Sequence, residues 1–281
     1  MIINTNISSL TAQEASKNTS NSLSSSLEKL SSGLKINKAS DDASGLAIAD
    51  KLRTQATSIN QAVDNGNSAV SLLQIADKSM SEQSTILDTI KAKLIQANTD
   101  TTSSDGREAI RKDITKLLTQ LDNIADQTNY NGTTLLQASA SSSAISSGLT
   151  FQVGEKSTNT ITNGGIQSNT SGLAMTTLAG LTTNGLTQTV AAAQQTIVDA
   201  AITKLNGYRG DIGSTQNQVE SAVRNLMTQS TNVTAAESII RDVDYAEESA
   251  NFNKQNIISQ AGSYAISQAN TVQQNVLKLL Q

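Results

Sequence analysis

VDAAITKLNGYRGDIGSTQNQVESAVRNLMTQSTNVTAAESII, residues 198–240, carries an apolar side chain at every seventh position. These positions are Val198, Leu205, Ile212, Val219, Leu226, Val233 and Ile240. A seven-residue period keeps one stripe of a helix facing a partner and winds the helices into a left-handed coil. The stretch therefore predicts a long helix, from about residue 190 to residue 231 or beyond, that packs lengthwise against others.

Two earlier segments show the same kind of spacing. One runs through Leu52, Ile59, Gly66, Leu73, Met80, Leu87 and Leu94. The other is shorter and contains Ile110, Ile114, Leu117, Leu121 and Ile124. We expect helices over about 43–98 and 107–127 that join the 190–231 helix. The predicted fold is mainly α, an elongated coiled-coil bundle whose core is formed by the apolar residues of the three stripes.

The two ends of the chain carry much thinner stripes. A helix over about 8–34 would present Leu23, Leu27, Leu30 and Leu34. A helix over about 251–280 would present Ile258, Ala265, Val272, Val276 and Leu279. We expect these two helices to pair, but two thin stripes bury little, and ordering costs about 1–2 kcal/mol per residue. They should therefore order only when neighbouring copies add surface; an ordinary terminal helical hairpin is the alternative.

The amino-acid composition changes over about 133–188, where the seven-residue spacing ends and Ser, Thr, Gly and Asn dominate. Residues 149–153 and 158–162 alternate like strands, and Asn163-Gly164 and Asn184-Gly185 are hairpin-turn signals. We expect a small, exposed β-hairpin region here. The Asn131-Gly132 pair is expected to close the preceding helix, because Gly is favoured just after a helix end.

Composition excludes most chemistry. The chain has no His, Cys, Trp or Pro, and its formal net charge is −4. Without His and Cys there is no thiol or imidazole nucleophile, base or metal ligand, so we expect no enzyme, no cofactor and no metal. Asp41-Asp42 and Asp242-Val243-Asp244 could be paired carboxylates for a metal or for acid–base chemistry, but helix capping or surface salt bridging explains them better.

Partners are limited in the same way. Lys and Arg are scattered, and the only aromatics are four Tyr and two Phe, so nucleic-acid binding is not expected. No apolar run approaches the ~20 residues of a membrane span, and Met1–Asn6 lacks the features of a signal peptide. The absence of Pro suits long helices, and it equally suits a chain that must refold quickly after passing through a narrow channel unfolded.

Several motifs together resemble those of bacterial flagellins. Near the start they are MIINTN (1–6), LSSGLKIN (30–37), SDDASGLAIA (40–49) and QTNYNG (127–132). Near the end they are IRDVDYAEE (240–248), QAGS (260–263) and VLKLLQ (276–281). They follow the family's order along most of the chain, and the chain is similar to a short, epsilon-proteobacterial form.

The resemblance implies a subunit that polymerises into the extracellular flagellar filament for motility. Residues 1–42 and 241–281 would form an inner terminal coiled-coil domain. Residues 43–240 would form the middle helical domain with the hairpin region, and the family's outer domains would be absent. The implied partners are other copies of the chain, an export chaperone, the filament cap and the junction proteins, after type III export. A hook–filament junction protein and a secreted coiled-coil adhesin are the alternatives.

Two further expectations come from the family. The window recognised by Toll-like receptor 5 corresponds to residues 88–96, where Thr89 and Lys93 replace an arginine and a leucine, so weak or no activation is expected. A plain solvated helix face is compatible with this. Related flagellins are often O-glycosylated, and the corresponding hydroxyls here are Ser139, Ser141, Ser142, Ser143, Ser146, Ser147, Thr158, Thr160 and Ser168. An unmodified polar loop is the alternative.

Overall fold

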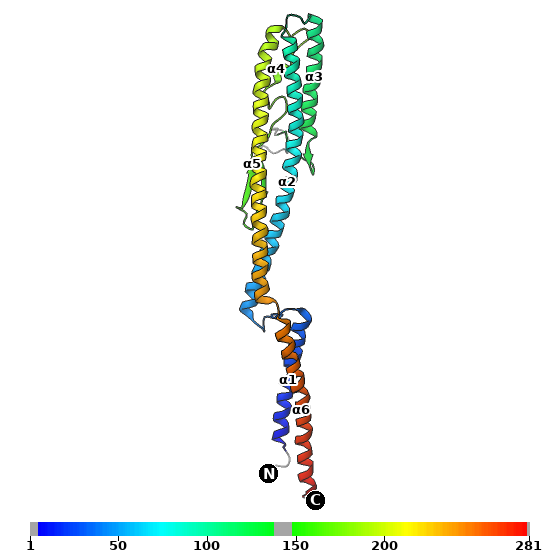
Figure 1. Cartoon of the computed structure of the whole chain (residues 1–281), viewed down its shortest axis with the longest axis vertical. Helices are drawn as coiled ribbons and strands as arrows, with labels where there is room; N and C mark the ends of the chain where they lie inside the picture. Colours follow the sequence, from blue (N-terminus) through cyan, green and yellow to red (C-terminus); the bar gives the residue numbers. More distant parts are fainter. Residues whose placement is uncertain (1–4, 138–147, 280–281) are drawn as a thin grey trace. The chain divides into compact units, whose positions relative to one another are not determined.

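The computed structural model describes residues 5–137 and 148–279, and within them the chain is mainly helical (Figure 1). The helices are α1 Ile7–Ser32, α2 Ala43–Ala97, α3 Ser104–Gln127, α4 Thr176–Ala179, α5 Gln188–Arg241 and α6 Tyr245–Leu279. The strands are β1 Asn129–Tyr130, β2 Thr133–Thr134, β3 Leu149–Gln152 and β4 Thr160–Asn163. The expected class, a helical bundle with a small β-hairpin region, is confirmed.

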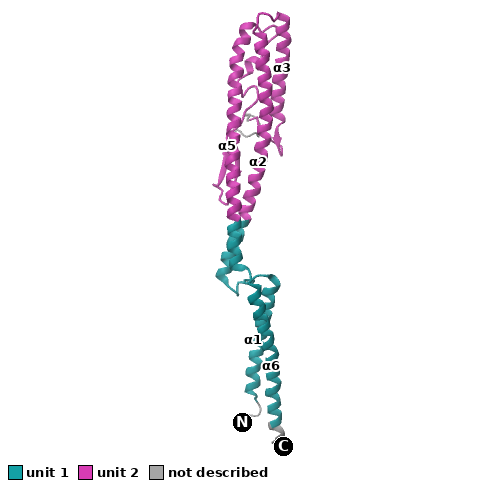
Figure 2. Cartoon of the chain, viewed as in Figure 1, with its two compact units in different colours: residues 1–56, 231–281 teal, residues 57–230 magenta. Residues whose placement is uncertain are grey.

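The chain divides into two compact units, coloured separately in Figure 2. Unit 1 contains residues 1–56 and 231–281, and unit 2 contains residues 57–230. Both α2 and α5 contribute to each unit, since the unit boundaries fall inside these helices. The inner-domain limits expected from the sequence, residues 42 and 241, therefore both lie within unit 1.

Unit 2 has a main apolar core formed by α2, α3, α5 and residues of the segment between α3 and α5, and a smaller second cluster where α2 and α5 meet β4. The stripe residues buried in unit 2 are Ile59, Leu73, Met80, Leu87, Leu94, Ile110, Ile114, Leu121, Val198, Leu205, Ile212, Val219 and Leu226. Leu117 and Ile124 are only half-buried, and their neighbours Leu118 and Ala125 take the inner positions. The inward face of a straight helix drifts relative to a strict seven-residue repeat, which accounts for the shift. Leu52 and Val233, in unit 1, are also half-buried.

Gly66 of α2 lies close to Val223 of α5. A Cβ built on Gly66 would stand 2.4 Å from Cγ2 of Val223. The glycine in the second stripe is therefore a packing requirement, since any side chain there would collide with α5.

The hairpins use different turns from those expected. Asn131 (φ 50°) and Gly132 (φ 81°) join β1 to β2, a two-residue connection with both residues left-handed. The expectation that this pair closes α3 is wrong, because α3 already ends at Gln127. β3 pairs with β4, but their turn is closed by the Val153 N–H donating to Asn159 O.

The two Asn-Gly pairs that were expected to form hairpin turns do not connect strands. Asn163 is the last residue of β4, so Asn163-Gly164 follows the hairpin. Asn184-Gly185 lies between α4 and α5, with Asn184 left-handed. The physical reason is that Asn and Gly satisfy any tight turn, so the pair locates a bend without saying what flanks it.

Unit 1 consists of the α1/α6 pair, the start of α2, the end of α5 and the two segments that connect them. Gly33 ends α1 in a left-handed conformation (φ 74°), and the two connecting segments then pair with each other. The Lys35 N–H donates to Arg241 O, and the Val243 N–H donates to Gly33 O. Backbone hydrogen bonds thus hold the α1–α2 connecting segment against the α5–α6 connecting segment.

One acid of each pair acts as a helix cap. Oδ1 of Asp42 accepts from the Gly45 N–H at the start of α2, and Oδ1 of Asp244 accepts from the Ala246 N–H at the start of α6. Asp41 accepts from the N–H groups of Asn37 and Lys38. These backbone donors lower the pKa of Asp41 and Asp42 below the ordinary value, since they stabilise the charged form.

Candidate assembly surfaces

The seam between α1 and α6 is formed by small and polar side chains. Ser26, the buried residue of α1, donates to the Glu248 carboxylate. Near the other end, Asn6 Nδ2 donates to Ala269 O at 3.1 Å. Between them, a Cβ built on Gly262 would lie 3.7 Å from the Cβ of Ser16. The two helices therefore approach closely but bury little apolar surface.

Large apolar side chains of the same two helices point away from the seam. Leu27 is 55% exposed, Ile257 67% and Val272 52%, and Ile7, Leu10, Ile258 and Tyr264 are exposed as well. At about 25 cal/mol per Å² of apolar surface, this face is where the pair has most to gain from a partner. The exposed large apolar side chains of both helices are therefore candidate contacts with other copies.

The stripes predicted for the terminal helices therefore fit the single chain only in part. Leu23, Leu30 and Leu34 are half-buried. The prediction that the stripe residues pack within the chain is wrong for four of them, which are exposed: Leu27, Ile258, Ala265 and Val272. The side chains of Val276 and Leu279 lie outside the described part. The physical reason is that small residues fill the seam, so the large apolar residues occupy the face beside it.

The seam residues could have been found from a pattern of small side chains. On α1 the half-buried or buried positions include Ala12, Ser16, Thr19, Leu23 and Ser26, which alternate by four and three residues. On α6 they include Ser259, Gly262, Ile266 and Ala269, with the same alternation. This is coiled-coil spacing carried mostly by Ala, Ser, Thr and Gly in place of Leu.

In unit 2, the residues of the receptor window form surface contacts. The exposed Thr89 donates from Oγ1 to Thr85 O, and Lys93 Nζ lies 3.1 Å from Oδ2 of Asp113 on α3. Lys91 pairs with Asp199 on α5. The window is thus tied to both neighbouring helices by ion pairs, and it carries no apolar side chain at Lys93.

A shielded ion pair secures the loop between α4 and α5. Arg111 donates from Nε and Nη2 to both carboxylate oxygens of Glu108, and from Nη1 to Leu181 O. The Asn184 N–H donates to the same carboxylate at 2.9 Å. These donors, Arg111 foremost, lower the pKa of Glu108 from 4.5 to about 2. The carboxylate therefore holds a helix and a loop together.

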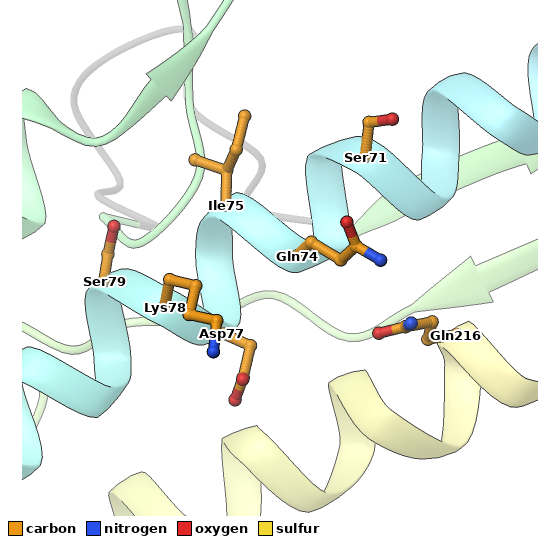
Figure 3. Close-up of a pocket in the computed structure, with 7 residues that line it drawn as sticks. All are labelled: Ser71, Gln74, Ile75, Asp77, Lys78, Ser79 and Gln216. Atoms are coloured by element: carbon orange, nitrogen blue, oxygen red, sulfur yellow. The ribbon is translucent and has the colours of Figure 1, made fainter.

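The groove shown in Figure 3 runs along α2. Gln74 and Asp77 lie on the side toward Gln216 of α5, and Asp77 accepts from Arg209 Nε at 2.9 Å. The remaining lining residues are Ser71, Ile75, Lys78 and Ser79. The groove is lined mainly by polar side chains, and its one carboxylate is already occupied by an arginine.

Two negative findings apply to residues 5–137 and 148–279. No group of three or more His, Cys, Asp or Glu in these ranges could hold a metal ion. None of the helices in this part of the chain is both long enough and apolar enough to span a bilayer.

The side chains predicted to carry O-linked sugar differ in their exposure. Thr158 and Thr160 are exposed at the β3–β4 hairpin. Ser168 is completely buried, with its Oγ 3.4 Å from Leu136 O, so its assignment to an exposed region is wrong. The reason is that the buried Gln83 of α2 donates to Ser168 O and fixes this loop against the core. The six serines Ser139, Ser141, Ser142, Ser143, Ser146 and Ser147 lie outside the described residues.

Comparison with known proteins identifies the family. Residues 3–141 match the bacterial flagellin N-terminal helical region, and residues 195–280 match the bacterial flagellin C-terminal helical region. A flagellin of Bacillus subtilis is 34% identical over 303 residues, and the match covers both chains completely. Flagellin B of Helicobacter pylori is 49% identical over 159 residues, which span 57% of this chain and 30% of that protein.

A solved structure agrees with these relatives. The crystal structure of Bacillus cereus flagellin aligns with a TM-score of 0.50 and 29% identity, covering 62% of this chain and 94% of that one. The full-length match to a flagellin does not favour a junction protein or an adhesin. The chain thus belongs to the bacterial flagellin family and is a structural subunit of the extracellular flagellar filament.

Proposed function

We propose that the α1/α6 pair is the part of this subunit that becomes ordered on polymerisation, by packing its outward apolar side chains against other copies. One observation carries the proposal: Leu27, Ile257 and Val272 are more than half exposed, although the two helices lie against each other. Burying a large apolar side chain contributes about 1.5–3 kcal/mol. In an isolated subunit the α1/α6 pair lacks this stabilisation, because these side chains stay in water. In a polymer they would be buried against other copies.

The contact between copies would be head-to-tail, because such a contact continues without closing and builds a helical filament. Residues 1–42 and 241–281 would then form the inner part of the filament. Residues 43–240 would form its surface, because the subunit is proposed to lack the outer domains of longer family members.

Charge placed on the outward face tests this proposal directly. Leu27→Asp and Val272→Asp should leave the helix content of the monomer unchanged and abolish growth from filament seeds, because an unpaired carboxylate would be buried between copies. Gln268→Asp is the matched control, since it adds the same charge at an exposed polar position of α6. Circular dichroism and electron microscopy provide the two readouts. Normal filaments from both apolar variants would overturn the proposal.

Removal of residues 262–281 is a coarser test of the same idea. The truncated chain should remain a soluble monomer with the helices of unit 2 intact, because the core of unit 2 contains none of these residues. It should not polymerise. Long filaments from the truncated chain would mean that the terminal pair is not the assembly element.

The subunit would be exported unfolded by the flagellar type III apparatus, with an export chaperone, and would be added beneath a filament cap beyond the junction proteins. The family supports these partners, and a chain without Pro refolds without slow isomerisation. Filament growth in cells lacking the cap protein is the test: secreted, unpolymerised monomer is expected. The proposed role involves no catalysis and no cofactor.

The subunit is proposed to activate Toll-like receptor 5 weakly or not at all. Lys93 pairs with Asp113, and a lysine in an apolar receptor contact would have to be desolvated. The 49% identity with a Helicobacter flagellin supports the epsilon-proteobacterial type. Purified monomer should be inactive in a receptor reporter assay, and the Thr89→Arg/Lys93→Leu double variant should gain activity. Strong activation by the unchanged monomer would refute this.

We propose O-linked sugar in the hairpin region, at the exposed hydroxyls of Thr158 and Thr160. The six serines of 139–147 remain proposed on the family resemblance alone. Ser168 is not among the proposed glycosylation sites, because its side chain is buried. The intact mass of the native protein decides the matter, since a mass equal to that of the bare sequence excludes any sugar.

A further inference from the structure

The chain contains the dipeptide Asn-Gly at five places: Asn65-Gly66, Asn131-Gly132, Asn163-Gly164, Asn184-Gly185 and Asn206-Gly207. In an unfolded chain all five share one reactivity. The backbone nitrogen of the glycine can reach the side-chain amide carbon of the asparagine, and no Cβ shields it. Differences among the five in the native protein must therefore come from the fold.

We propose that Asn131-Gly132 is a modification site, at which the folded protein converts Asn131 spontaneously to aspartate and isoaspartate. The Gly132 nitrogen forms a bond to Cγ of Asn131 and loses its proton. The bond from Cγ to Nδ2 breaks, and the amide leaves as ammonia, so a five-membered imide closes. Water then opens the imide at either carbonyl, and no reactant other than water is needed.

The turn between β1 and β2 leaves both reacting groups unrestrained. Asn131 and Gly132 are both exposed, and no atom lies within 4 Å of a Cβ built on Gly132. Among the contacts described, neither the Asn131 side chain nor the Gly132 N–H makes a hydrogen bond. The flanking strands have two residues each, so few backbone bonds oppose the rotation that brings nitrogen to carbon.

Asn206-Gly207 is a matched control within the same chain. Asn206 is also exposed, and a Cβ built on Gly207 also meets no atom within 4 Å. The difference is that Gly207 lies in the middle of α5, where its N–H belongs to the helical ladder. Attack at Asn206 therefore requires local opening of the helix, whereas attack at Asn131 does not.

The other three pairs are restrained in different ways. Asn65 lies in α2, and its side chain bonds to Gln61 and Gln152. Asn163 is 3% exposed, and its Oδ1 accepts from Thr215.

Asn184 resembles Asn131 most, since it is exposed and left-handed. However, the Gly185 N–H, which would be the nucleophile, donates to Thr182 O at 2.9 Å. The order of reactivity is therefore Asn131 first, Asn184 second and the remaining three last.

The modification would change the hairpin itself. Either product adds a negative charge, and isoaspartate also adds one atom to the main chain within a two-residue turn. The β1–β2 pairing depends on that turn, as does the bond from the Leu135 N–H to Thr128 O. Aged copies should therefore carry a loosened hairpin next to the buried Leu135 and Leu136.

Peptide mapping of the unchanged protein tests the proposal. The folded chain is incubated in mildly alkaline buffer made with heavy-oxygen water, acidified, digested at low pH and analysed for isoaspartate by mass spectrometry. Oxygen incorporated during the incubation marks the reaction and excludes conversion during digestion. Modification at Asn131 should accumulate at least about tenfold faster than at Asn206, since opening a helix interior costs far more than moving a turn.

Two controls complete the experiment. In denaturant the five sites should react at similar rates, and the Asn131→Gln variant should lose the signal at residue 131 alone, because the equivalent ring would have six members. The proposal is overturned if Asn206 keeps pace with Asn131 in the folded chain. It is equally overturned if Asn131 reacts in denaturant and is inert when folded.

Discussion

The two helical assemblies of this subunit are built from the same kinds of element but differ in what they bury. In unit 2, the residues Leu73, Met80 and Leu87 of α2 are completely buried against α3 and α5. In unit 1, Ser26 is the buried residue of α1, and Leu27 next to it is mostly exposed. Unit 2 thus contains its own partner surfaces, whereas the α1/α6 pair presents apolar surface that only further copies can cover.

The largest expected effect separates these two roles with one substitution in each region. Leu87→Ala removes a completely buried side chain and should lower the free energy of unfolding of the monomer by about 2–5 kcal/mol. Leu27→Ala should cost less than about 1 kcal/mol in the monomer, since the residue is mostly exposed, yet it should impair polymerisation. Denaturant unfolding and seeded growth measure the two effects. Equal destabilisation of the monomer by the two variants would contradict the difference in burial between unit 2 and the α1/α6 pair.

A pair of glycines tests the packing of unit 2 with effects of opposite sign. Gly66→Ala should destabilise by about 1–3 kcal/mol, because its Cβ would stand 2.4 Å from Val223 Cγ2. Gly207→Ala should stabilise by up to about 1 kcal/mol, since it meets no atom within 4 Å and alanine favours the helix. Thermal unfolding measures both. Val223→Ala should partly rescue Gly66→Ala, and failure to do so would show that the close approach is not the cause.

The same contrast explains what could be predicted from the sequence. Large apolar residues at a seven-residue period identified α2 and α5 closely, because burial of many Leu and Ile side chains outweighs local preferences. The α1/α6 seam was missed because the stripes were drawn through large apolar residues. The spacing of small residues such as Ser16 and Gly262 is a weaker signal, since small residues are also common on solvent-facing surfaces. The burial of Ser168 depends on Gln83, 85 positions away along the chain, and no local pattern contains that contact.

Acid should weaken unit 2 through Glu108. The folded pKa of Glu108, about 2, lies below its ordinary value of 4.5. The carboxylate therefore stabilises the fold fully above about pH 4.5, and this contribution is lost as the pH falls toward 2. The Glu108→Gln variant should be less stable than the wild type at neutral pH, and the difference should shrink on acidification. Unfolding curves across this range measure it; a difference independent of pH would contradict the assignment.

Asp42 provides the corresponding test in unit 1. Its pKa is also lowered, first by the Gly45 N–H, so its contribution is likewise present at neutral pH and lost in acid. Asp42→Asn keeps a capping side chain, because asparagine is also a good N-cap, and its effect should be smaller than that of Glu108→Gln. If Asp42→Asn lowered the stability more than Glu108→Gln, the carboxylate in unit 1 would contribute more to the fold than the carboxylate in unit 2, contrary to this prediction.

The smallest expected effect concerns the register of α1 against α6. The bond between Ser26 and Glu248 is a polar contact in a seam of small residues, and such contacts can fix register without adding much stability. Ser26→Ala and Glu248→Gln should each change monomer stability by less than about 1 kcal/mol. Their effect should instead appear in how uniquely the two helices are aligned.

An engineered disulfide makes that alignment measurable, because the chain has no cysteine of its own. In the assembled filament, Ser16→Cys with Gly262→Cys should form an intrachain bond readily, since the Cβ separation of 3.7 Å is close to the usual ~3.8 Å. Ser16→Cys with Ile266→Cys samples an alignment shifted by about one turn. Adding Ser26→Ala should lower the yield of the first pair and raise that of the second. Unchanged yields would mean that the register is set by the close approach at Gly262 alone.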